Sequence, residues 1–420
     1  MQLTRFLIQV YPFSANLCVS INIATKNITK SKGNFVTKMK NALPLVPLAL
    51  VLAYAPHTAS ARSLLGPDLQ VETVFSNTYT STGANSTVYG NVLAGGVSTI
   101  GASGFVAGNL VSGGAANLGG LGTSGRDAKV AGSILSGGVS TTGDHAEVGA
   151  NITSSGASTV GANSRIGGSM VSGGASTTGD SSTVNGDIWS GGNASIGAAA
   201  TVGGTLGATG SISVGAGGSV NSRQALSSSP IDANASTGAI RTTVISDAQQ
   251  VVDAQSALTK MGTGTALAPT ITTDRTLNSG VYSAVSLSTS AGTTLYLDGQ
   301  GLDDQYWVFN ITDILATGAS TNITLINAGA NSSVIWNTGG YATLGANSNF
   351  VGIILANDYI SVGAHAKLTG VGNSCGGLYS AASYVSMGDS SSVGGYGCGG
   401  TGDDFNVDPS GTAYYANSSR

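Results

Sequence analysis

Apolar residues return along this chain at a fixed interval. Valine or isoleucine occupies every eighteenth position of one column, with a single longer step where six residues are inserted around the string GLGTSGR. A second apolar column lies four places further on, and a third lies twelve places on. The first column is Val88, Val106, Val130, Val148, Ile166, Val184, Val202 and Val220; the second runs from Val92 to Leu206; the third runs from Ile100 to Val214.

Within each unit, apolar and polar positions alternate at period two, as they do in half-buried strands. Paired glycines divide the unit into short segments. A fixed period of about 20 residues indicates a solenoid in which each unit buries its inner face against the next. Eighteen residues suffice for three short strands and three corners. The pattern predicts a mostly β fold, a right- or left-handed triangular β-helix.

The same repeat motif recurs near the C-terminal end of the chain. The string ATLGANSNFVGII (342–354) overlays STVGANSRIGGSM (158–170), and ISVGAHAKLTG follows one repeat later. We therefore expect N-terminal coils over 62–225 and C-terminal coils over 263–400, followed by a polar tail, 401–420. Whether the two sets form one stack or two stays open from the sequence.

One amphipathic helix is expected between the two sets of coils. The string ISDAQQVVDAQSALTKM carries Ala248, Val251, Val252, Ala254, Leu258 and Met261 on one stripe. Ser246 and Gln249 form a capping-box pattern at its start. A linker and helix over 226–262 should lay this single long helix along one side of the solenoid.

The first 61 residues have the features of a targeting segment. A short basic start at Met39, an apolar run and the Ala59-Ser60-Ala61 site predict a signal peptide over 39–61, with cleavage before Arg62. Residues 1–38 form a leader of doubtful reality. After residue 61 the chain keeps all 20 acidic but only ten of the 16 basic residues, a net charge of −10. This charge argues against nucleic acid or an anionic membrane as partner, and we expect a secreted, extracellular protein.

Few residues suggest chemistry. Cys375 and Cys398 are candidates for a disulfide in an oxidising compartment. Asp144 and Asp180 recur at a corner, where a turn explains them, and the pair Asp303-Asp304 is expected to be a solvated turn rather than a calcium site. No catalytic residue, metal site or cofactor is predicted, and we expect no enzyme.

Longer strings resemble a known family. LNSGVYS, TTLYLDGQGLDDQYWVFNI, TNITLINAGANSSVIWNTGGYATLGANSNFVGIILA and ISVGAHAKLTG, within 246–395, are similar to the microbial ice-binding (antifreeze) proteins. The N-terminal string LLGPDLQVETVFSNTYTSTGANSTVYGN also looks like that family's opening. The resemblance implies a discontinuous β-helix with one flanking helix, which binds ice crystals through a flat face, and we expect a monomer.

Hydroxyl residues occupy the outward position just before the third apolar column. Stacked coils would place them about 4.8 Å apart, where they could hold water in a regular array. The candidate ice-binding face is Ser81, Thr99, Thr141, Thr159, Thr177, Ser195, Ser213, Thr343, Ser361 and Ser386, with Asn117 in the same column.

Two alternatives remain open from the sequence. One is a competing face that carries Asn91, Asn109, Ser133, Asn151, Ser169 and Asp187 together with Leu93, Val111, Leu135 and Trp189. The other is a different function, that of a secreted β-helical adhesin or a self-assembling structural protein.

Overall fold

The computed structural model describes residues 64–66, 69–329, 331–371, 376–395, 405–407 and 411–415. All of them belong to the compact unit Thr58–Arg420. The predicted leader, the signal peptide and the Cys375–Cys398 disulfide lie outside the described residues.

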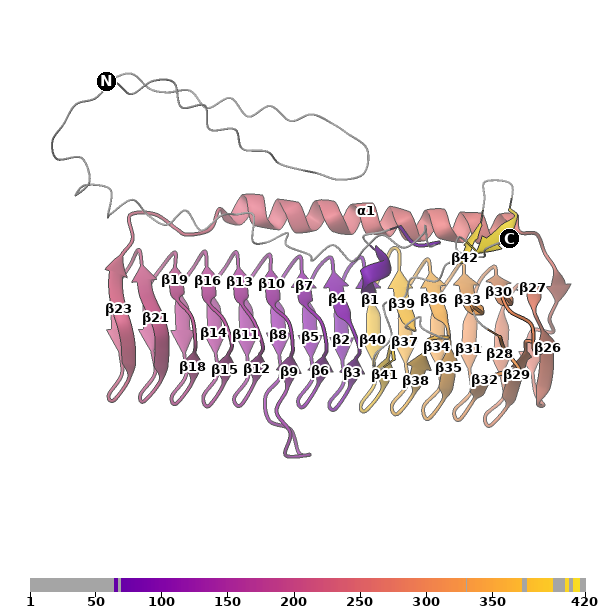
Figure 1. Ribbon diagram of the computed structural model, residues 1–420, viewed down its shortest axis with the longest axis horizontal. Coiled ribbons are helices and arrows are strands. Elements are labelled where there is room, and N and C mark those ends of the chain that lie inside the picture. The colour runs from indigo at the N-terminus through magenta and orange to yellow at the C-terminus, as the bar shows by residue number, and fades with distance from the viewer. Residues whose placement is uncertain are drawn as a thin grey trace, which may run out of the picture. The chain divides into compact units, whose positions relative to one another are not determined.

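The described chain forms a β-helix with three walls, and a single helix lies along it (Figure 1). Every strand pairing between coils is parallel, and the predicted fold class is therefore confirmed. One wall is a separate sheet of 14 strands, which we call the 14-stranded wall. In spatial order its strands are β22 (Ile212–Val214), β20 (Ala194–Ile196), β17 (Ser176–Thr178), β14 (Ser158–Val160), β11 (Ser140–Thr142), β8 (Ala116–Leu118), β5 (Ser98–Ile100), β2 (Thr80–Thr82), β40 (Val385–Met387), β37 (Ile360–Val362), β34 (Ala342–Leu344), β31 (Leu315–Thr317), β28 (Leu287–Thr289) and β25 (Thr270–Ile271).

The other two walls share a sheet of 27 strands, because β21 (Thr201–Ala208) and β23 (Ser219–Ala225) run around the corner between them. The wall beneath the helix, the helix wall, continues through β19 (Ile188–Ser190), β16 (Met170–Ser172), β13 (Ile152–Ser154), β10 (Ile134–Ser136), β7 (Leu110–Ser112), β4 (Asn91–Ala94), β1 (Glu72–Ser76), β39 (Gly377–Ser380), β36 (Ile353–Ala356), β33 (Ser333–Thr338), β30 (Tyr306–Ile311), β27 (Gly280–Ala284) and β24 (Thr265–Ala266).

The third wall, the charged wall, consists mostly of shorter strands. They are β18 (Thr183–Val184), β15 (Arg165–Ile166), β12 (Glu147–Val148), β9 (Lys129–Val130), β6 (Phe105–Val106), β3 (Thr87–Val88), β41 (Ser392–Val393), β38 (Lys367–Thr369), β35 (Asn349–Val351), β32 (Asn322–Ile326), β29 (Thr294–Asp298) and β26 (Arg275–Asn278).

The first coil lies in the middle of the stack, not at an end. Strand β1 pairs with β4 on one side and with β39 on the other, and β2 and β3 likewise lie between β5 and β40 and between β6 and β41. The chain thus builds outward to β23, runs back along the stack through the segment 226–232 and α1 (Ala233–Lys260), and returns from β24 to the middle (Figure 1). The N-terminal and C-terminal coils therefore form one continuous stack, which answers the question that periodicity left open.

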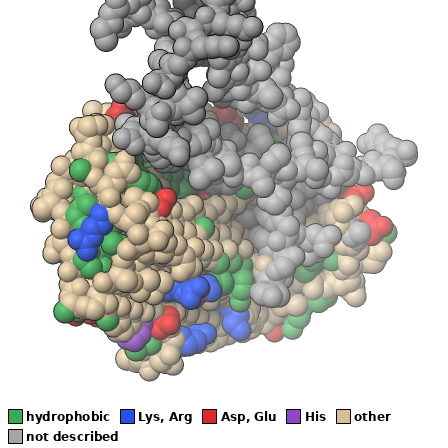
Figure 2. All heavy atoms as spheres, turned by 60° about the vertical axis from the view of Figure 1, so that its left-hand side comes forward, with side chains coloured by type: hydrophobic (Ala, Val, Ile, Leu, Met, Phe, Trp, Pro, Cys, Tyr) green, Lys and Arg blue, Asp and Glu red, His purple; other side chains and the backbone are tan. Residues whose placement is uncertain are grey.

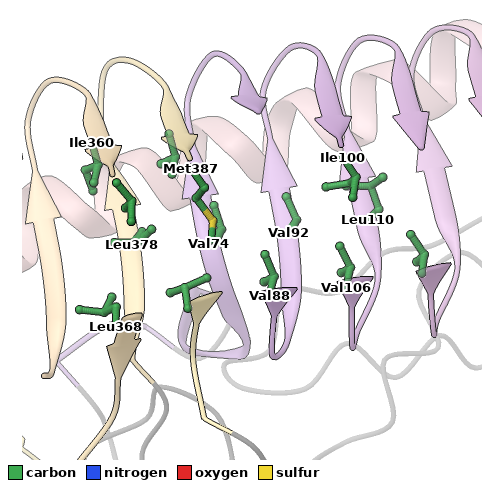
Figure 3. Close-up of a cluster of buried hydrophobic side chains, with 14 of the residues drawn as sticks. Val74, Val88, Val92, Ile100, Val106, Leu110, Ile360, Leu368, Leu378 and Met387 are labelled. Carbon is green, nitrogen blue, oxygen red and sulfur yellow. The ribbon is translucent and has the colours of Figure 1, made fainter. Parts of the chain in front are cut away.

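The predicted apolar columns fill the interior. Val88, Val92 and Ile100 are each at most 1% exposed, and their counterparts in the other inner coils are buried as well. At the joint between the two halves, Val74 and Leu378 come from paired strands and point into the same core (Figure 3). A single hydrophobic core thus runs through the joint, since no polar layer separates the halves there.

Helix α1 begins at Ala233, several turns before the predicted capping box. Asp232 caps it, since its Oδ1 accepts a hydrogen bond from the Asn234 backbone N–H at 3.0 Å. The expectation that Ser246 starts the helix is wrong. Of the predicted stripe, Val251 and Leu258 are fully buried, but Val252 is 41% exposed. Ile240 and Val244 extend the buried stripe toward the N-terminus.

The segment that the sequence marked as a polar tail contains two short strands. β42 (Phe405–Val407) pairs antiparallel with β43 (Ala413–Tyr415). Phe405 is buried in the cluster beneath α1, and its ring centroid lies 5.3 Å from that of Tyr306. This hairpin therefore adds to the packing of the helix wall.

Candidate functional site

The ten candidate hydroxyl residues all lie on the outer surface of the 14-stranded wall. The backbone pairings put neighbours in register, for example Thr141 with Thr159 and Thr159 with Thr177. Ser81 pairs with both Thr99 and Ser386, so the row crosses the joint between the halves without a break. We call this row, with Asn117 between Thr99 and Thr141, the hydroxyl file.

The register extends the file by three residues that the sequence did not single out. Thr343 pairs with Ala316, Ala316 with Ser288, and Ser288 with Thr270. The hydroxyls of Ser288 and Thr270 are hydrogen-bonded at 2.9 Å. The coil spacing changes in this region, which hid these positions; the alternation in 287–289 and 315–317 was the signal that could have found them. The file, one position on each of the 14 strands, contains no ionisable side chain.

The exposure of the file differs along its length. Most of the exposed members lie in the N-terminal half, whereas the members contributed by the C-terminal coils from Thr343 to Ser386 are only partly exposed. The exposed residues are Thr99, Thr159, Thr177, Ser195 and Ser213 in the N-terminal half and Thr270 at the C-terminal end of the wall, and the partly exposed ones include Ser81, Thr141, Thr343, Ser361 and Ser386. The N-terminal half of the wall therefore offers its hydroxyls more freely to solvent.

The row beside the file changes character at the first coil. In the N-terminal half it consists mostly of small or β-branched residues, among them Val97, Ala115, Val139, Ala157 and Ala175. In the other direction it becomes four stacked tyrosines: Tyr79, Tyr384, Tyr359 and Tyr341. Their successive ring centroids are 4.6, 5.0 and 4.6 Å apart, and the planes are nearly parallel.

This tyrosine stack alters its own acidity. Desolvation by burial, with the neighbouring tyrosines and the Asp358 carboxylate as lesser contributions, raises the pKa of Tyr359 and of Tyr384 above the ordinary value of 10.0. These two phenols are therefore neutral at physiological pH, and the wall gains no charge from them.

Glycines border the other side of the file because the coils approach closely there. A Cβ on Gly161 would overlap the carbonyl carbon of Gly143, and the same holds at Gly101 and Gly179 against the coils before them. Next to these glycines the chain turns through residues with positive φ, including His145 and His365. The two histidines thus occupy equivalent corners, and the wall ends in a uniform edge.

The side chains of the competing face make contacts within the protein. Leu93, Val111 and Leu135 pack into the cluster beneath α1. Asn151 Oδ1 accepts a hydrogen bond from the Ser169 backbone N–H at 2.8 Å. Equivalent bonds run from coil to coil through Asn91, Asn109, Ser133, Ser169 and Asp187. These side chains tie neighbouring coils together, and the helix covers part of the surface between them.

The charged wall is unlike the other two. Lys129, Glu147 and Arg165 lie next to one another on adjacent strands, with Lys129 Nζ 3.0 Å from Glu147 Oε1. Lys367 lies on the same wall in the C-terminal half. Within the part of the chain that the structure describes, only the 14-stranded wall combines a surface that no other element covers with a central row free of charge.

The acidic residues that the sequence singled out have structural partners. Asp144 Oδ1 and Asp180 Oδ1 each accept a hydrogen bond from a backbone N–H of the next coil at 2.7 Å, which explains their recurrence at corners. Asp304 lies in a turn with positive φ and accepts a hydrogen bond from Asn331. Within the described ranges no group of three potential metal ligands is found, nor is any helix there long and apolar enough to cross a membrane.

Comparison with known proteins gives one family. Residues 225–392 match the family described as Ice-binding-like, so the resemblance read from the sequence is confirmed over that range. A curated relative, ice-binding protein 1 of Shewanella frigidimarina, is 36% identical over 96 residues, which are 23% of this chain and 11% of the relative's length.

Solved structures of ice-binding proteins are also similar. One, from the Antarctic ascomycete Antarctomyces psychrotrophicus, is 15% identical with a TM-score of 0.37, and the match covers 80% of this chain and 98% of that one. Another, from an Antarctic bacterium of the Flavobacteriaceae, is 14% identical with a TM-score of 0.32 and the same coverage of both chains.

Proposed function

We propose that this chain, whose residues 225–392 match the ice-binding-like family, is a secreted protein that adsorbs to ice through the outer surface of the 14-stranded wall. The observation that carries the proposal is the hydroxyl file, one in-register position on each strand without an ionisable side chain. At about 4.8 Å per strand the file is roughly 60 Å long. Its partner is the ice crystal, and the protein acts as a monomer without cofactor.

The physical basis is the order of the surface. Threonine and serine on a rigid sheet fix their hydroxyls and methyl groups at a constant repeat, and water bound to partners already held in place loses little further entropy. Such water can join an advancing ice lattice. Each coil adds one rank of contacts, and ice that grows between adsorbed molecules must curve, which lowers the local freezing point.

The interior explains why this surface is held so uniformly. At the corner between the helix wall and the 14-stranded wall, Ser112 Oγ lies 2.7 Å from two carbonyl oxygens, that of Gly96 in the preceding coil and that of Ala115 in its own coil, and its one proton is shared between them. Ser136 and Ser190 have the equivalent two acceptors, one carbonyl oxygen in the preceding coil and one in their own. Buried hydroxyls thus tie neighbouring coils together at these three corners.

The test is adsorption to growing ice by two variants of one coil. Thr159→Tyr places a large ring near the middle of the exposed half of the file, and Arg165→Tyr places the same ring on the charged wall. We expect the fraction of Thr159→Tyr recovered in ice to fall by roughly half or more, since a central obstruction separates the ranks on both sides of it from the crystal.

The wild-type chain from Arg62 should be enriched in ice and shape crystals into facets, and Arg165→Tyr should match it. Equal recovery of both variants in ice would mean that the protein binds ice through a surface other than this wall. Exclusion of the wild-type chain from ice, with round crystals, would favour the adhesin or self-assembling protein instead.

A further inference from the structure

The two terminal coils depart from the rule that inward positions are apolar. At the β23 end, Leu206, which is fully buried, pairs with Arg223. Paired residues of parallel strands point to the same side, so Arg223 occupies the inward column that Val92, Ile134 and the other inner coils fill with aliphatic side chains. Arg223 is exposed, because no coil follows it.

The core beneath Arg223 is open to solvent at this end. Ile212, Val214 and Val220 are only partly buried, although they pack against the main core. Figure 2, which brings this end forward, shows hydrophobic side chains gathered around a basic one. A long side chain of this kind can lay its methylene groups over apolar surface and keep its charge in water.

The opposite end of the stack also has an arginine at an inward position, on another wall. Arg275 of β26 pairs with Leu295, which is fully buried, so Arg275 also takes an inward position, and it too is exposed. Burial raises the pKa of Tyr282, and the charge of Arg275 partly offsets that rise. The Tyr282 hydroxyl donates a hydrogen bond to the Asn278 carbonyl oxygen at 2.6 Å. Arg275 therefore lies over the end of the core, as Arg223 does.

These positions decide what happens if two molecules meet end to end. All pairings between coils are parallel, so the β23 edge of one copy matches the β24–β26 edge of another and could continue the stack. That joint would bury Arg223 of one copy and Arg275 of the next in a single apolar cross-section.

Neither arginine would find a carboxylate in that joint. The described inward positions of the terminal coils hold none, and Asp274, at the corner beside Arg275, accepts a hydrogen bond from the Thr294 backbone N–H of its own molecule. Burying two unpaired cations is strongly unfavourable.

We propose that Arg223 and Arg275 block end-to-end association with further copies of this chain, and so keep an otherwise extendable β-helix monomeric. The inference does not depend on ice binding, because it concerns only the ends of the stack.

The test uses the chain from Arg62 onward, which contains every described residue. In Arg223→Leu/Arg275→Leu the two ends become apolar and complementary. We expect its weight-average mass, measured by sedimentation equilibrium, to rise at least twofold with concentration and to return to the monomer value on dilution. The wild-type chain should stay monomeric over the same range.

The matched control is Arg165→Leu/Arg241→Leu, which removes the same charge and adds the same leucines at exposed positions away from the ends. It should remain monomeric. A folded Arg223→Leu/Arg275→Leu variant with the mass of a monomer would overturn the proposal, as would association of the wild-type chain.

A second variant decides the matter if the double leucine variant does not fold. Arg223→Glu places a carboxylate in the same cross-section as Arg275 of the next copy, and we expect association that weakens with added salt. A monomeric Arg223→Glu at low salt would contradict the role given to the arginines.

Discussion

At the scale of single residues, the close spacing of the coils depends on glycines at the corners, which carry no side chain. The glycine row beside the hydroxyl file lies against the backbone of the preceding coil, so even one methyl group there has no room. The neighbouring turn positions need positive φ, which Asn and Gly adopt most readily among the residues found there. The restriction of the repeat to a few small residue types is thus a steric requirement of stacking.

Two glycines in different surroundings should respond to substitution in opposite ways. Gly161→Ala should lower the free energy of unfolding by about 1–3 kcal/mol, because its Cβ would meet the backbone of the neighbouring coil. Gly238→Ala, in α1, has nothing within 4 Å of its new methyl group. It should raise the free energy of unfolding by about 0.5–1 kcal/mol through better helix propensity. Denaturant unfolding of both variants measures the difference, and a stable Gly161→Ala would show that the corners can relax.

The candidate site could be predicted at this scale because side-chain direction follows from alternation alone. The positions proposed as site residues from the sequence lie in one row once the register is known. Thr270, Ser288 and Ala316 were missed since the regular interval is lost in their coils. Which of the two candidate faces the helix covers could not be predicted from the sequence, because it depends on how the helix docks on the stack.

At the scale of elements, α1 owes its length to packing more than to its own residues. Its first half, Ala233 to Ile245, contains glycine, threonine and β-branched residues, which are poor helix formers. That half is held by Ile240 and Val244 against the helix wall and by Thr237 Oγ1, which donates to the Gly137 carbonyl oxygen at 2.9 Å. The start of the helix was mispredicted because tertiary contacts decide it.

Two adjacent valines of α1 test the packing. Val251→Ala should lower the free energy of unfolding by about 1–3 kcal/mol, since Val251 is fully buried against the helix wall. Val252 lies mostly on the solvent side of the helix. Val252→Ala should therefore change the free energy of unfolding by only about 0.5 kcal/mol or less. Thermal and denaturant unfolding would compare the two, and equal effects would mean that the helix does not dock as described.

At the scale of the whole molecule, a complete coil is the smallest segment whose deletion should leave the fold intact. Deleting Arg165–Ser182 removes β15, β16 and β17, one complete turn, and brings Thr183 into the place of Arg165 beside Glu147. We expect this variant to fold, because the segment 226–232 can accept a shift of about 4.8 Å, and to bind ice more weakly since one rank of the file is lost.

Circular dichroism and thermal melting report the fold of this deletion variant, and recovery in ice reports its activity. The control deletes Arg165–Gly173, half a turn, which puts the following segments on the wrong walls and should prevent folding. Failure of the full-turn deletion as well would mean that neighbouring coils are not interchangeable.

The order of coils in space lay beyond prediction for a physical reason. Each repeat presents nearly the same edges as every other, so periodicity says that coils stack but not which coil follows which. The pairing of β1 with β39 depends on α1 carrying the chain back along the stack, and on the match of Val74 to Leu378 and Ser76 to Ser380.

The central place of the first coil has a consequence for how the protein is made. Ala84 donates its backbone N–H to Asp389 Oδ1 across 305 residues of sequence, so one edge of the earliest coil to leave the ribosome stays bare until nearly the last one arrives. Such long-range closure is slow, and an unpaired strand edge invites aggregation while it waits. Synthesis at low temperature weakens hydrophobic association between nascent chains, and would therefore favour correct closure over misassembly.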